Sequence, residues 1–437
     1  MKTSNGWPIV KMGTIAVVKG GKRLPKGADF TNAGYPYIRA RDIRNGQVTF
    51  DDPVYIDDHT RSKIKRYTVE EGDICITIVG INIGDVGIIP RSLHNANLTE
   101  NAAKVTNLVG CDSAYLNVYL QSSGMKEQMQ LLSSGAAQDK LGLYKIKLLD
   151  VYLPELTTQR KIAAILTAYD DLIETNKRRI ALLEKMAEEL YREWFVRMRF
   201  PGHQNTKFVK GVPEGWPFDL GSTFFDHVKG KSYSSPEISN EEGSCFFITL
   251  KSFHRRGGYR KEGLKYYSGS YKDDQCVQTG DVVMAVTDMT QDRAVVGEVA
   301  RIPSLLGKKA VISLDVMRLI PKEMSSTFLY AYMRHSGFAN YIKEFANGAN
   351  VLHLKPDLVG KQRLLFPPKD LREQFSDLAD PIYQEVGALE DANAVLTQTR
   401  DLLLPRLISG KLSVEALDIQ FPPSMKEEAT EPEPAHA

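Results

Sequence analysis

Short clusters of lysine and arginine are the residues of this chain whose types and spacing point most directly to chemistry. Ammonium and guanidinium groups bind phosphate oxygens, and arginine also reads guanine edges. The candidates in the first half of the chain are Lys19, Lys22, Arg23, Arg39, Arg41, Arg44, Lys63, Lys65 and Arg66. Those in the second half are Lys231, Lys251, Arg255, Arg256, Tyr259, Arg260 and Lys261. These clusters predict a surface that binds nucleic acid.

Glycines accompany two of the clusters, in Gly20-Gly21-Lys22-Arg23 and in Arg255-Arg256-Gly257-Gly258. Because glycine has no side chain, its backbone could lie close to a phosphate while the neighbouring cation supplies charge. The alternative is that each charge run is a solvated face without a ligand. Clusters at matching places in the two halves of the chain favour the functional interpretation.

Motifs for catalysis are absent from the sequence. There is no GxxxxGK[ST] loop, no HExxH pair and no EF-hand loop. The Pro-Pro pairs at 367–368 and 422–423 lack the Asp/Asn-Pro-Pro-aromatic form used by amino-group methyltransferases on nucleic acids. No nucleophile, base and orienting carboxylate form a recognisable set. The direct signal for catalysis is therefore weak, and no metal site is predicted.

Composition limits the kind of surface that can be present. A net charge of +2 gives no strong field across the whole molecule, so a nucleic-acid surface must be local. The cysteines form no CxxC pair, which predicts buried free thiols in a reducing compartment. No signal-like leader opens the chain, and no apolar run approaches the roughly 20 residues of a membrane span. We expect a soluble cytoplasmic protein that does not contact a membrane.

The segments that must position these cations belong to an internal repeat of the sequence. Gly6-Trp7-Pro8 recurs as Gly215-Trp216-Pro217, and Gly72-Asp73 recurs as Gly280-Asp281. Further counterparts, all at one interval, are Gly135, Leu141 and Pro154 with Gly348, Leu354 and Pro367. Solenoid repeats are roughly 20–50 residues long, so a unit of this length is a domain. The repeat predicts two related domains with similar but different surfaces.

Short β-branched runs bounded by glycine and proline predict mixed α/β domains. In the first copy these runs are 35–38, 74–79 and 86–90, with a helical segment near 113–132. In the second copy they are 245–250, 281–286 and 295–302, with a helical segment near 327–345.

A long helix is predicted between the two copies, because Gln159 to Trp194 contains neither glycine nor proline. Its apolar residues alternate in steps of three and four, which is a heptad seam. A helix of this length is about 54 Å long and needs a long partner. The partner is predicted from Leu371 to Leu404, where Pro381 should kink or restart the helix.

The two helices are predicted to form an antiparallel coiled coil, with polar Asn176 fixing its register. The residues assigned to the seam are Ile173, Asn176, Ile180, Leu183, Leu190, Trp194, Leu389, Leu396 and Leu403. The alternative is an ordinary core helix. Repetition of the stripe after each domain favours the coiled coil.

Two DNA-binding domains joined by a pair of long helices would restrict the geometry of the DNA site. Readers on one face of a duplex must lie about one helical turn apart, ~34 Å, which a helix pair of this length can span. Because the copies differ in their basic residues, the predicted site is bipartite and asymmetric, with an unread spacer.

The chain resembles the specificity subunits of type I restriction–modification enzymes over nearly its whole length. The motifs that carry the resemblance are N-G-W-P (5–8), Y-P-Y-I-R-A-R-D-I (35–43), E-G-D-I-C-I-T (71–77), L-P-E-L-T-T-Q-R-K-I-A-A-I-L (153–166), E-W-F-V-R-M-R-F-P-G (193–202), P-E-G-W-P (213–217) and L-L-L-P-R-L-I-S-G-K-L (402–412). No one motif is decisive, but their order along the chain is that of the family.

The resemblance implies an α+β fold in which two target-recognition domains are separated by two long helices. The implied boundaries are a first recognition domain at 1–157, a central helix at 158–200, a second recognition domain at 201–370, a distal helix at 371–415 and a disordered acidic, proline-rich tail at 416–437. It also implies double-stranded DNA as ligand, with two methyltransferase subunits and restriction/translocase subunits as partners. S-adenosylmethionine, ATP and Mg²⁺ would be bound by those partners, and this chain would be non-catalytic.

Two functions from other classes remain open at this stage. One is a self-sufficient DNA-modifying enzyme with a divergent active site, which would transfer methyl groups or cleave DNA as a purified chain. The other is a structural spacer that binds proteins at both ends, which would not distinguish one DNA sequence from another.

Overall fold

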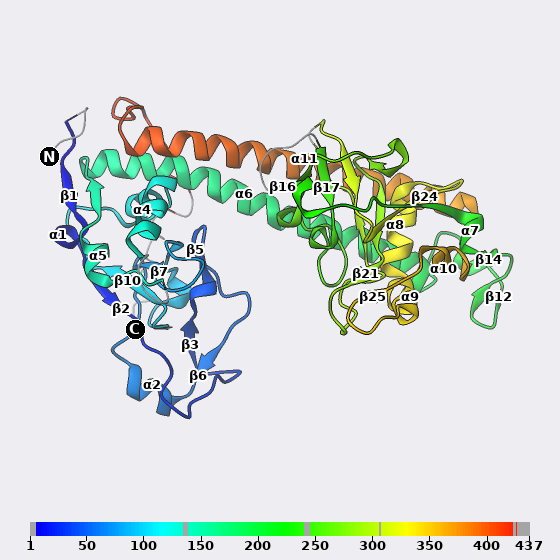
Figure 1. Ribbon diagram of the computed structural model, residues 1–437, viewed down its shortest axis with the longest axis horizontal. Coiled ribbons are helices and arrows are strands. Elements are labelled where there is room, and N and C mark those ends of the chain that lie inside the picture. Colours follow the sequence, from blue (N-terminus) through cyan, green and yellow to red (C-terminus); the bar gives the residue numbers. More distant parts are fainter. Residues whose placement is uncertain (1–5, 134–138, 240–244, 306, 423–424, 426–437) are drawn as a thin grey trace, which may run out of the picture. The chain divides into compact units, whose positions relative to one another are not determined.

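The computed structural model describes residues 6–133, 139–239, 245–305, 307–422 and 425. The chain divides into two compact units. Unit 1 is Met1–Glu174 with Val395–Ala437, and unit 2 is Thr175–Ala394. Both units mix helices and strands (Figure 1), which confirms the predicted α+β class.

Unit 1 is built around a six-stranded sheet with the order β2-β10-β7-β8-β5-β4. Its strands are β1 Ile9–Lys11, β2 Val17–Gly20, β3 Tyr35–Ile38, β4 Ile43–Arg44, β5 Gly46–Val48, β6 Tyr55–Ile56, β7 Ile74–Thr77, β8 Val86–Ile88, β9 Asn97–Leu98, β10 Ala102–Thr106 and β11 Asp150–Tyr152. Its short helices are α1 Met12–Ile15, α2 Asp58–Ile64, α3 Ser113–Leu120, α4 Ser123–Ser133 and α5 Leu143–Lys147. Strand β7 is buried along its whole length, as its continuous apolar run predicts.

Unit 2 contains a four-stranded sheet, β15-β24-β20-β22, and a five-stranded sheet, β16-β18-β17-β23-β19. Its strands are β12 Phe208–Val209, β13 Val212–Pro213, β14 Phe218–Leu220, β15 Phe225–Lys229, β16 Ile238–Ser239, β17 Cys245–Ile248, β18 Lys265–Tyr267, β19 Cys276–Val277, β20 Val282–Ala285, β21 Thr287–Asp288, β22 Val299–Arg301, β23 Ala310–Ile312, β24 Val316–Pro321, β25 Leu352–His353 and β26 Arg363–Leu365. Its short helices are α7 Gly221–Phe224, α8 Ser326–His335, α9 Phe338–Ile342 and α10 Pro356–Gly360.

The same strand plan recurs in the two units. The run β2-β10-β7-β8 in unit 1 matches β15-β24-β20-β22 in unit 2, and all of its pairings are antiparallel. The parallel pair β3 with β9 matches the parallel pair β17 with β23. The pair β1 with β11 matches β14 with β26. The sequence repeat therefore has a counterpart in the strand topology of each unit.

The repeated Gly-Asp pair forms the same turn before the central strand of each unit. Gly72 and Gly280 have φ of +79° and +88°, a backbone conformation that favours glycine. The following aspartate closes the turn with its side chain. Asp73 Oδ2 accepts the backbone N–H of Glu70 at 2.9 Å, and Asp281 Oδ2 accepts that of Gln278 at 2.7 Å.

The aspartates of these turns also bind a cation on the neighbouring strand. Lys104 Nζ on β10 lies 2.8 Å from Asp73 Oδ2, and Arg318 Nη2 on β24 lies 3.1 Å from Asp281 Oδ1. Each turn is thus tied to the sheet by an ion pair that is largely shielded from water.

Two long helices complete the units. Helix α6 spans Leu156–Tyr191, continues as a π-turn to Val196, and helix α11 spans Lys369–Ile408. In unit 1, Asp170 Oδ1 on α6 lies 2.5 Å from Arg400 Nη1 on α11. Leu166 and Leu407 belong to the same apolar core in this unit.

In unit 2 the two helices run antiparallel where they are in contact. Asn176 Nδ2 donates to Asn393 Oδ1 at 2.9 Å, and one turn further along α6, Arg179 Nη2 donates to Glu385 Oε1 at 2.9 Å. Of the seam residues, Ile173, Asn176, Trp194 and Leu389 are buried, whereas Ile180, Leu183, Leu190, Leu396 and Leu403 are partly buried. The coiled coil as the device that separates two recognition domains stays a prediction.

Three details differ from the sequence predictions. Helix α11 continues through Pro381, so it does not restart there, and the alternative outcome, a kink, stays a prediction; the proline is exposed, and water can solvate the backbone groups it leaves unpaired. Strand β22 begins at Val299 rather than Val295, because Asp288 holds the preceding residues in a loop. Cys276 is half-buried, whereas the other three thiols are buried as predicted.

Some predictions concern residues outside the described part of the chain. Asn5 of the N-G-W-P motif and Gly135 of the repeat lie there, and so does most of the predicted tail at 416–437. Within the described residues, no helix is long and apolar enough to cross a membrane.

Candidate nucleic-acid interface

Lys22 and Lys231 occupy the same position in the two units. Each follows the first strand of the repeated sheet, and its backbone N–H donates to a carbonyl of a buried strand. Lys22 N lies 2.8 Å from Leu98 O, and Lys231 N lies 2.8 Å from Ile312 O. The Lys22 side chain is exposed and the Lys231 residue is half-buried. Two lysines predicted from separate clusters are therefore structural counterparts.

The glycines before these lysines serve the fold. A Cβ on Gly21 would lie 2.1 Å from Thr99 O, and a Cβ on Gly230 would lie 1.9 Å from Ser313 O. Both glycines are needed because the backbone passes against a strand. Gly20 and Gly21 also line a hollow with Lys22 and Arg23, so the close approach of a phosphate stays a prediction.

The second glycine pair is also enclosed by protein. A Cβ on either Gly257 or Gly258 would lie 2.8 Å from Arg334 Nη1. The turn packs against that guanidinium, and the close approach of a phosphate there stays a prediction.

A hollow of about 300 Å³ in unit 1 brings cations together that are distant in the sequence. Lys22 and Arg23 line it with Lys140, and Glu100 lies among them. Arg23 Nε is 3.5 Å from Glu100 Oε1, and both side chains are solvent-accessible. Such an exposed pair contributes little stability, so phosphate can replace the carboxylate at small cost. Lys140 was not among the predicted residues because no other cation lies close to it in the sequence; its position just before Leu141 of the repeat was the available signal.

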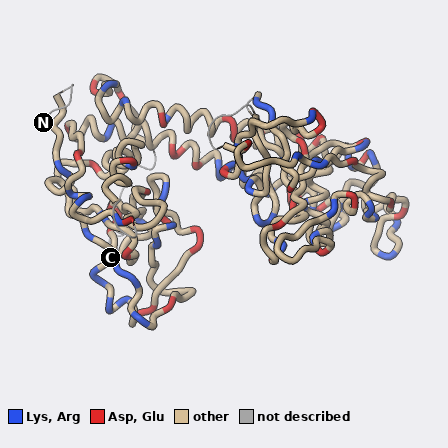
Figure 2. Tube along the Cα trace, viewed as in Figure 1, with Lys and Arg blue, Asp and Glu red and all other residues tan. Residues whose placement is uncertain are grey.

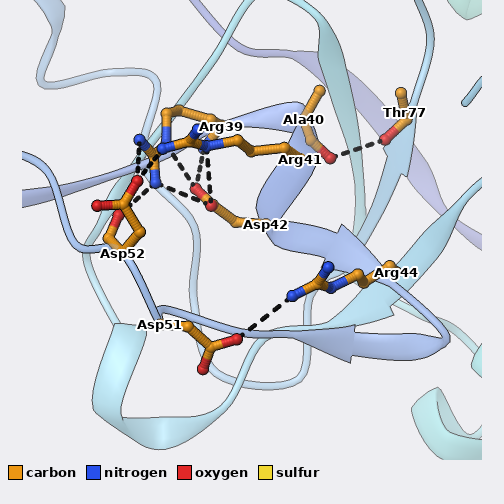
Figure 3. Close-up of polar contacts among 8 residues, drawn as sticks. All are labelled: Arg39, Ala40, Arg41, Asp42, Arg44, Asp51, Asp52 and Thr77. Atoms are coloured by element: carbon orange, nitrogen blue, oxygen red, sulfur yellow. Dashed lines mark hydrogen bonds and ion pairs between the residues drawn. The ribbon is translucent and has the colours of Figure 1, made fainter. Parts of the chain in front are cut away.

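Arg39, which precedes the 3₁₀ turn Ala40–Asp42, points toward Asp42 and Asp52 (Figure 3). Its Nη2 lies 3.1 Å from Asp42 Oδ1, and its side chain is only 17% exposed. Partial burial opposes its charge, but Asp42 and Asp52 outweigh that and raise the pKa of the Arg39 guanidinium. Arg39 therefore stabilises the turn, and its predicted contact with DNA has no support from its position.

Arg41 and Arg44 project from the same region but face acidic residues (Figure 3). Arg41 pairs with Asp52, and Arg44 Nη2 lies 3.3 Å from Asp51 Oδ2. All four side chains are more than half exposed, so water and salt screen both pairs. The surface here is close to neutral, and these arginines can reach phosphate only by leaving an aspartate.

The turn that corresponds to Arg39–Asp42 in unit 2 is Thr249–Ser252. Ser252 Oγ accepts the backbone N–H of Thr249 at 3.2 Å, as Asp42 Oδ2 accepts that of Arg39 at 2.8 Å. This alignment makes the exposed Lys251 the counterpart of Arg41. The two units therefore place a cation at the same point, with different surroundings.

Helix α2 carries a second basic surface in unit 1. Lys63, Lys65 and Arg66 are exposed on and just after this helix, and Figure 2 shows cations gathered around it. In contrast, Arg61 of the same helix packs inward, with its guanidinium 4.9 Å from the Tyr35 ring and bonded to Asn97 Oδ1 at 2.5 Å. The exposed residues could bind phosphate without disturbing the fold.

The cluster from Lys251 to Lys261 in unit 2 contains exposed residues and residues that pack against the rest of the protein. Arg255 and Arg256 are exposed, and Arg255 Nη1 lies 3.6 Å from Asp292 Oδ2. Arg260 is also exposed, 3.7 Å from Glu262. Tyr259 packs against the apolar core, and burial raises the pKa of its hydroxyl. Its ring is therefore not available to stack on a base.

Lys261 belongs to the contact between this cluster and helix α11. Its Nζ lies 3.4 Å from Glu390 Oε1, and the Glu390 side chain is only 21% exposed. Burial raises the pKa of the Glu390 carboxyl, and the Lys261 ammonium opposes that shift.

Lys19, at the end of β2, is exposed. No cluster of acidic, histidine or cysteine side chains suited to a metal ion occurs among the described residues.

Comparison with known proteins identifies this architecture. Residues 4–185 match the model of the type I restriction modification DNA specificity domain. The chain is 24% identical over 427 residues to the type I restriction enzyme MjaIX specificity subunit of Methanocaldococcus jannaschii, covering 95% of this chain and 96% of that one. It is 21% identical to the MjaVIII specificity subunit of the same organism, covering 96% of each chain. The chain is thus similar to type I restriction–modification specificity subunits along nearly its whole length, in line with the resemblance that its motifs predicted.

The fold has a solved counterpart. The crystal structure of a type I restriction–modification system S subunit from M. genitalium matches with a TM-score of 0.54 and 15% sequence identity. The match covers 93% of this chain and 99% of that one. At this identity the likeness concerns the fold alone.

Proposed function

We propose that this chain reads a bipartite, asymmetric DNA site for a type I complex and performs no chemistry itself. The observation that carries the proposal is the repeated plan of the two units. Each unit places a lysine, Lys22 or Lys231, at the same point after its first sheet strand. Around that lysine the exposed cations differ, so two half-sites of different sequence are expected.

The long helices fit the role of a spacer between two readers. Helix α6 contains 36 residues and helix α11 contains 40. At 1.5 Å per residue, each is at least about 54 Å long. This length exceeds the ~34 Å between successive turns of a DNA duplex. We therefore propose that the helices set the length of the unread spacer.

Exposed apolar residues on the helices fit the docking of methyltransferase subunits. On α6 these are Leu172, Leu182 and Met186, which are 47%, 63% and 58% exposed. On α11 they include Val395 and Leu402, which are 59% and 64% exposed. Leu182 and Met186 are four residues apart and therefore share one face of α6, which can contribute to an apolar patch that another protein covers.

The remaining partners of the complex follow from the family. Two methyltransferase subunits would bind along the helices, and restriction/translocase subunits would join them. S-adenosylmethionine, ATP and Mg²⁺ would be bound by those subunits. In this proposal the chain directs modification of target adenines and restriction of unmodified DNA.

Sequencing of methylated bases in cells with and without this chain tests the proposal. We expect one bipartite motif to lose its methylation when the chain is deleted. Replacing residues 1–150 by the recognition domain of another specificity subunit should change one half of the motif and leave the other half intact. A change in both halves, or methyl transfer by the purified chain alone, would contradict the proposal.

A further inference from the structure

Each unit exposes one apolar side chain at the tip of the loop that follows its central strand. After β7 this residue is Ile81, which is 97% exposed. After β20 it is Met289, which is 68% exposed. Both loops begin at strands that are completely buried, so an exposed apolar tip contrasts with the residues just before it.

Hydrogen bonds show that the two residues occupy equivalent positions. Ile78 O accepts the N–H of Leu141 at 2.9 Å, and Val286 O accepts the N–H of Leu354 at 2.8 Å. The next residues, Val79 and Thr287, form antiparallel bridges with Lys140 and His353. Ile81 and Met289 each lie two residues after the bridging residue of their own unit.

The equivalence also holds on the other side of the loops. Gly84 N donates to Thr77 O at 3.0 Å, and Gly297 N donates to Ala285 O at 2.8 Å. The unit 2 loop between these points is longer than the unit 1 loop. An exposed apolar tip is thus present in both units although the loops differ in length and sequence.

Both loops are held in place by their own hydrogen bonds. In unit 2 the buried carboxylate of Asp288 accepts the N–H groups of Thr290 at 2.9 Å and Val295 at 2.7 Å. In unit 1 Ile83 N donates to Gly80 O at 3.3 Å, and Asp85 N donates to Asn82 O at 3.0 Å. The tips are therefore positioned before any ligand binds.

The surroundings of the tips are polar and, in unit 1, basic. Ile78, which leads into the first loop, lines the same hollow as Lys22, Arg23 and Lys140. Asn82 beside Ile81 is exposed. In unit 2 the residues Thr290, Gln291 and Asp292 beside Met289 are exposed. A single apolar side chain among polar groups is a poor protein-docking surface, because such surfaces are contiguous apolar patches.

We propose that Ile81 and Met289 are wedges that enter the DNA stack, one in each half-site. Isoleucine and methionine are among the side chains that proteins insert between base steps. A rigid tip loses little conformational freedom when it inserts, and in unit 1 the neighbouring cations would bind the adjacent phosphates. The inference rests on the proposed function, and it adds a device that opens a base step at two defined places.

Fluorescence of 2-aminopurine tests the wedges in the complete complex with the methyltransferase subunits. The probe duplexes carry the methylated motif, with 2-aminopurine placed in one half-site at a position that is not methylated. We expect fluorescence to rise when the wild-type complex binds, because 2-aminopurine is brighter when unstacked. Ile81→Ala should remove the rise in one half-site and Met289→Ala in the other, with affinity about tenfold weaker in each case. Ile81→Leu and Met289→Leu should retain both properties.

Matched controls are Val109→Ala and Leu220→Ala, which truncate other exposed apolar residues in units 1 and 2. These variants should leave fluorescence and affinity unchanged. Unchanged fluorescence in both tip variants would overturn the wedge. So would a variant that binds methyltransferase subunits less well but unstacks DNA normally, since that result assigns the tips to a protein contact. If the wild-type complex showed no sequence preference at all, the proposed function itself would fail.

Discussion

The two units share one strand plan but differ in the charges on their surfaces. The comparison distinguishes residues that hold the fold from residues that a ligand could contact. The Gly-Asp turn, the enclosed glycine and the lysine after it are shared. Around the equivalent cations Arg41 and Lys251 the units diverge. Arg41 faces Asp52, whereas Lys251 is exposed, and no ion pair to Lys251 is found in the part of the chain that the structure describes. Residues that hold the plan recur, and residues that face solvent vary.

The ion pair behind the Gly-Asp turn should show the largest difference between the units. Lys104 is 12% exposed and pairs with Asp73, whereas Arg318 is 23% exposed and also donates to Cys276 O at 3.1 Å. Removing Asp73 leaves a more deeply buried cation with fewer partners. We expect Asp73→Ala to destabilise unit 1 by about 4 kcal/mol and Asp281→Ala to destabilise unit 2 by about 2 kcal/mol.

Hydrogen exchange of peptides from β10 and β24 measures these two effects separately. Asp150→Ala is the control, because its pair with Lys11 is solvent-exposed and should contribute less than about 1 kcal/mol. Equal losses in the two units would show that the second partner of Arg318 is unimportant.

The enclosed glycines should respond alike in the two units. A methyl group at Gly21 or Gly230 would collide with a backbone carbonyl, so the strand must move. We expect Gly21→Ala and Gly230→Ala each to destabilise its own unit by about 3 kcal/mol. Gly20→Ala is the matched control in unit 1, since its Cβ would meet Leu143 Cδ1 at an ordinary 3.5 Å. Exchange rates that rise in only one of the two glycine variants would break the correspondence between the units.

Acid should destabilise unit 2 through a residue that unit 1 lacks. His335 on α8 and Ser122 lie at the same distance from the N-caps of their helices, Ser325 and Asp112. Burial lowers the pKa of the His335 imidazole to about 3, so it stays neutral in the folded protein near Glu188. The unfolded chain takes up this proton below its ordinary pKa of 6.5, and stability is therefore lost as the pH falls from 6.5 towards 3.

Between pH 7 and pH 5 this residue should cost unit 2 about 2 kcal/mol. His335→Gln should remove that part of the pH dependence, while α3 in unit 1 should not respond to the substitution. Hydrogen exchange of the α8 and α3 peptides at the two pH values provides the measurement. The same acid dependence in the glutamine variant would assign the loss to other groups.

The equivalent lysines should give the smallest effects. Lys22 is exposed beside other cations, whereas Lys231 is half-buried. We expect Lys22→Ala to weaken binding of the full site by about 1 kcal/mol and to reduce the salt dependence by about 0.9 in log–log slope. Lys231→Ala should have a smaller effect. Lys11→Ala is the control because Asp150 already balances its charge. An unchanged salt slope for the Lys22 variant would remove this lysine from the DNA surface.

Local patterns in the sequence predicted much of the framework. The apolar run at β7, the helical composition of α6 and the Gly-Asp turns depend on neighbours within a few residues, so periodicity and turn chemistry identify them. The repeat of these signals also predicted the shared plan. Element ends were less well predicted, because Asp288 displaces the start of β22 through its hydrogen bond to Val295.

Composition and residue spacing were sufficient to predict the α+β class, the long helices and the positions of the cationic clusters. Which of these cations remain available to a ligand depends on contacts that form only in the folded chain. Arg39 is committed to Asp42 and Asp52, Lys261 to Glu390, and Tyr259 to the core, while Lys140 joins Lys22 in one hollow. Several of these partners are far apart in the chain and meet only when the strands pair. A charge counted along the sequence therefore becomes a binding group only if folding leaves it without an internal partner.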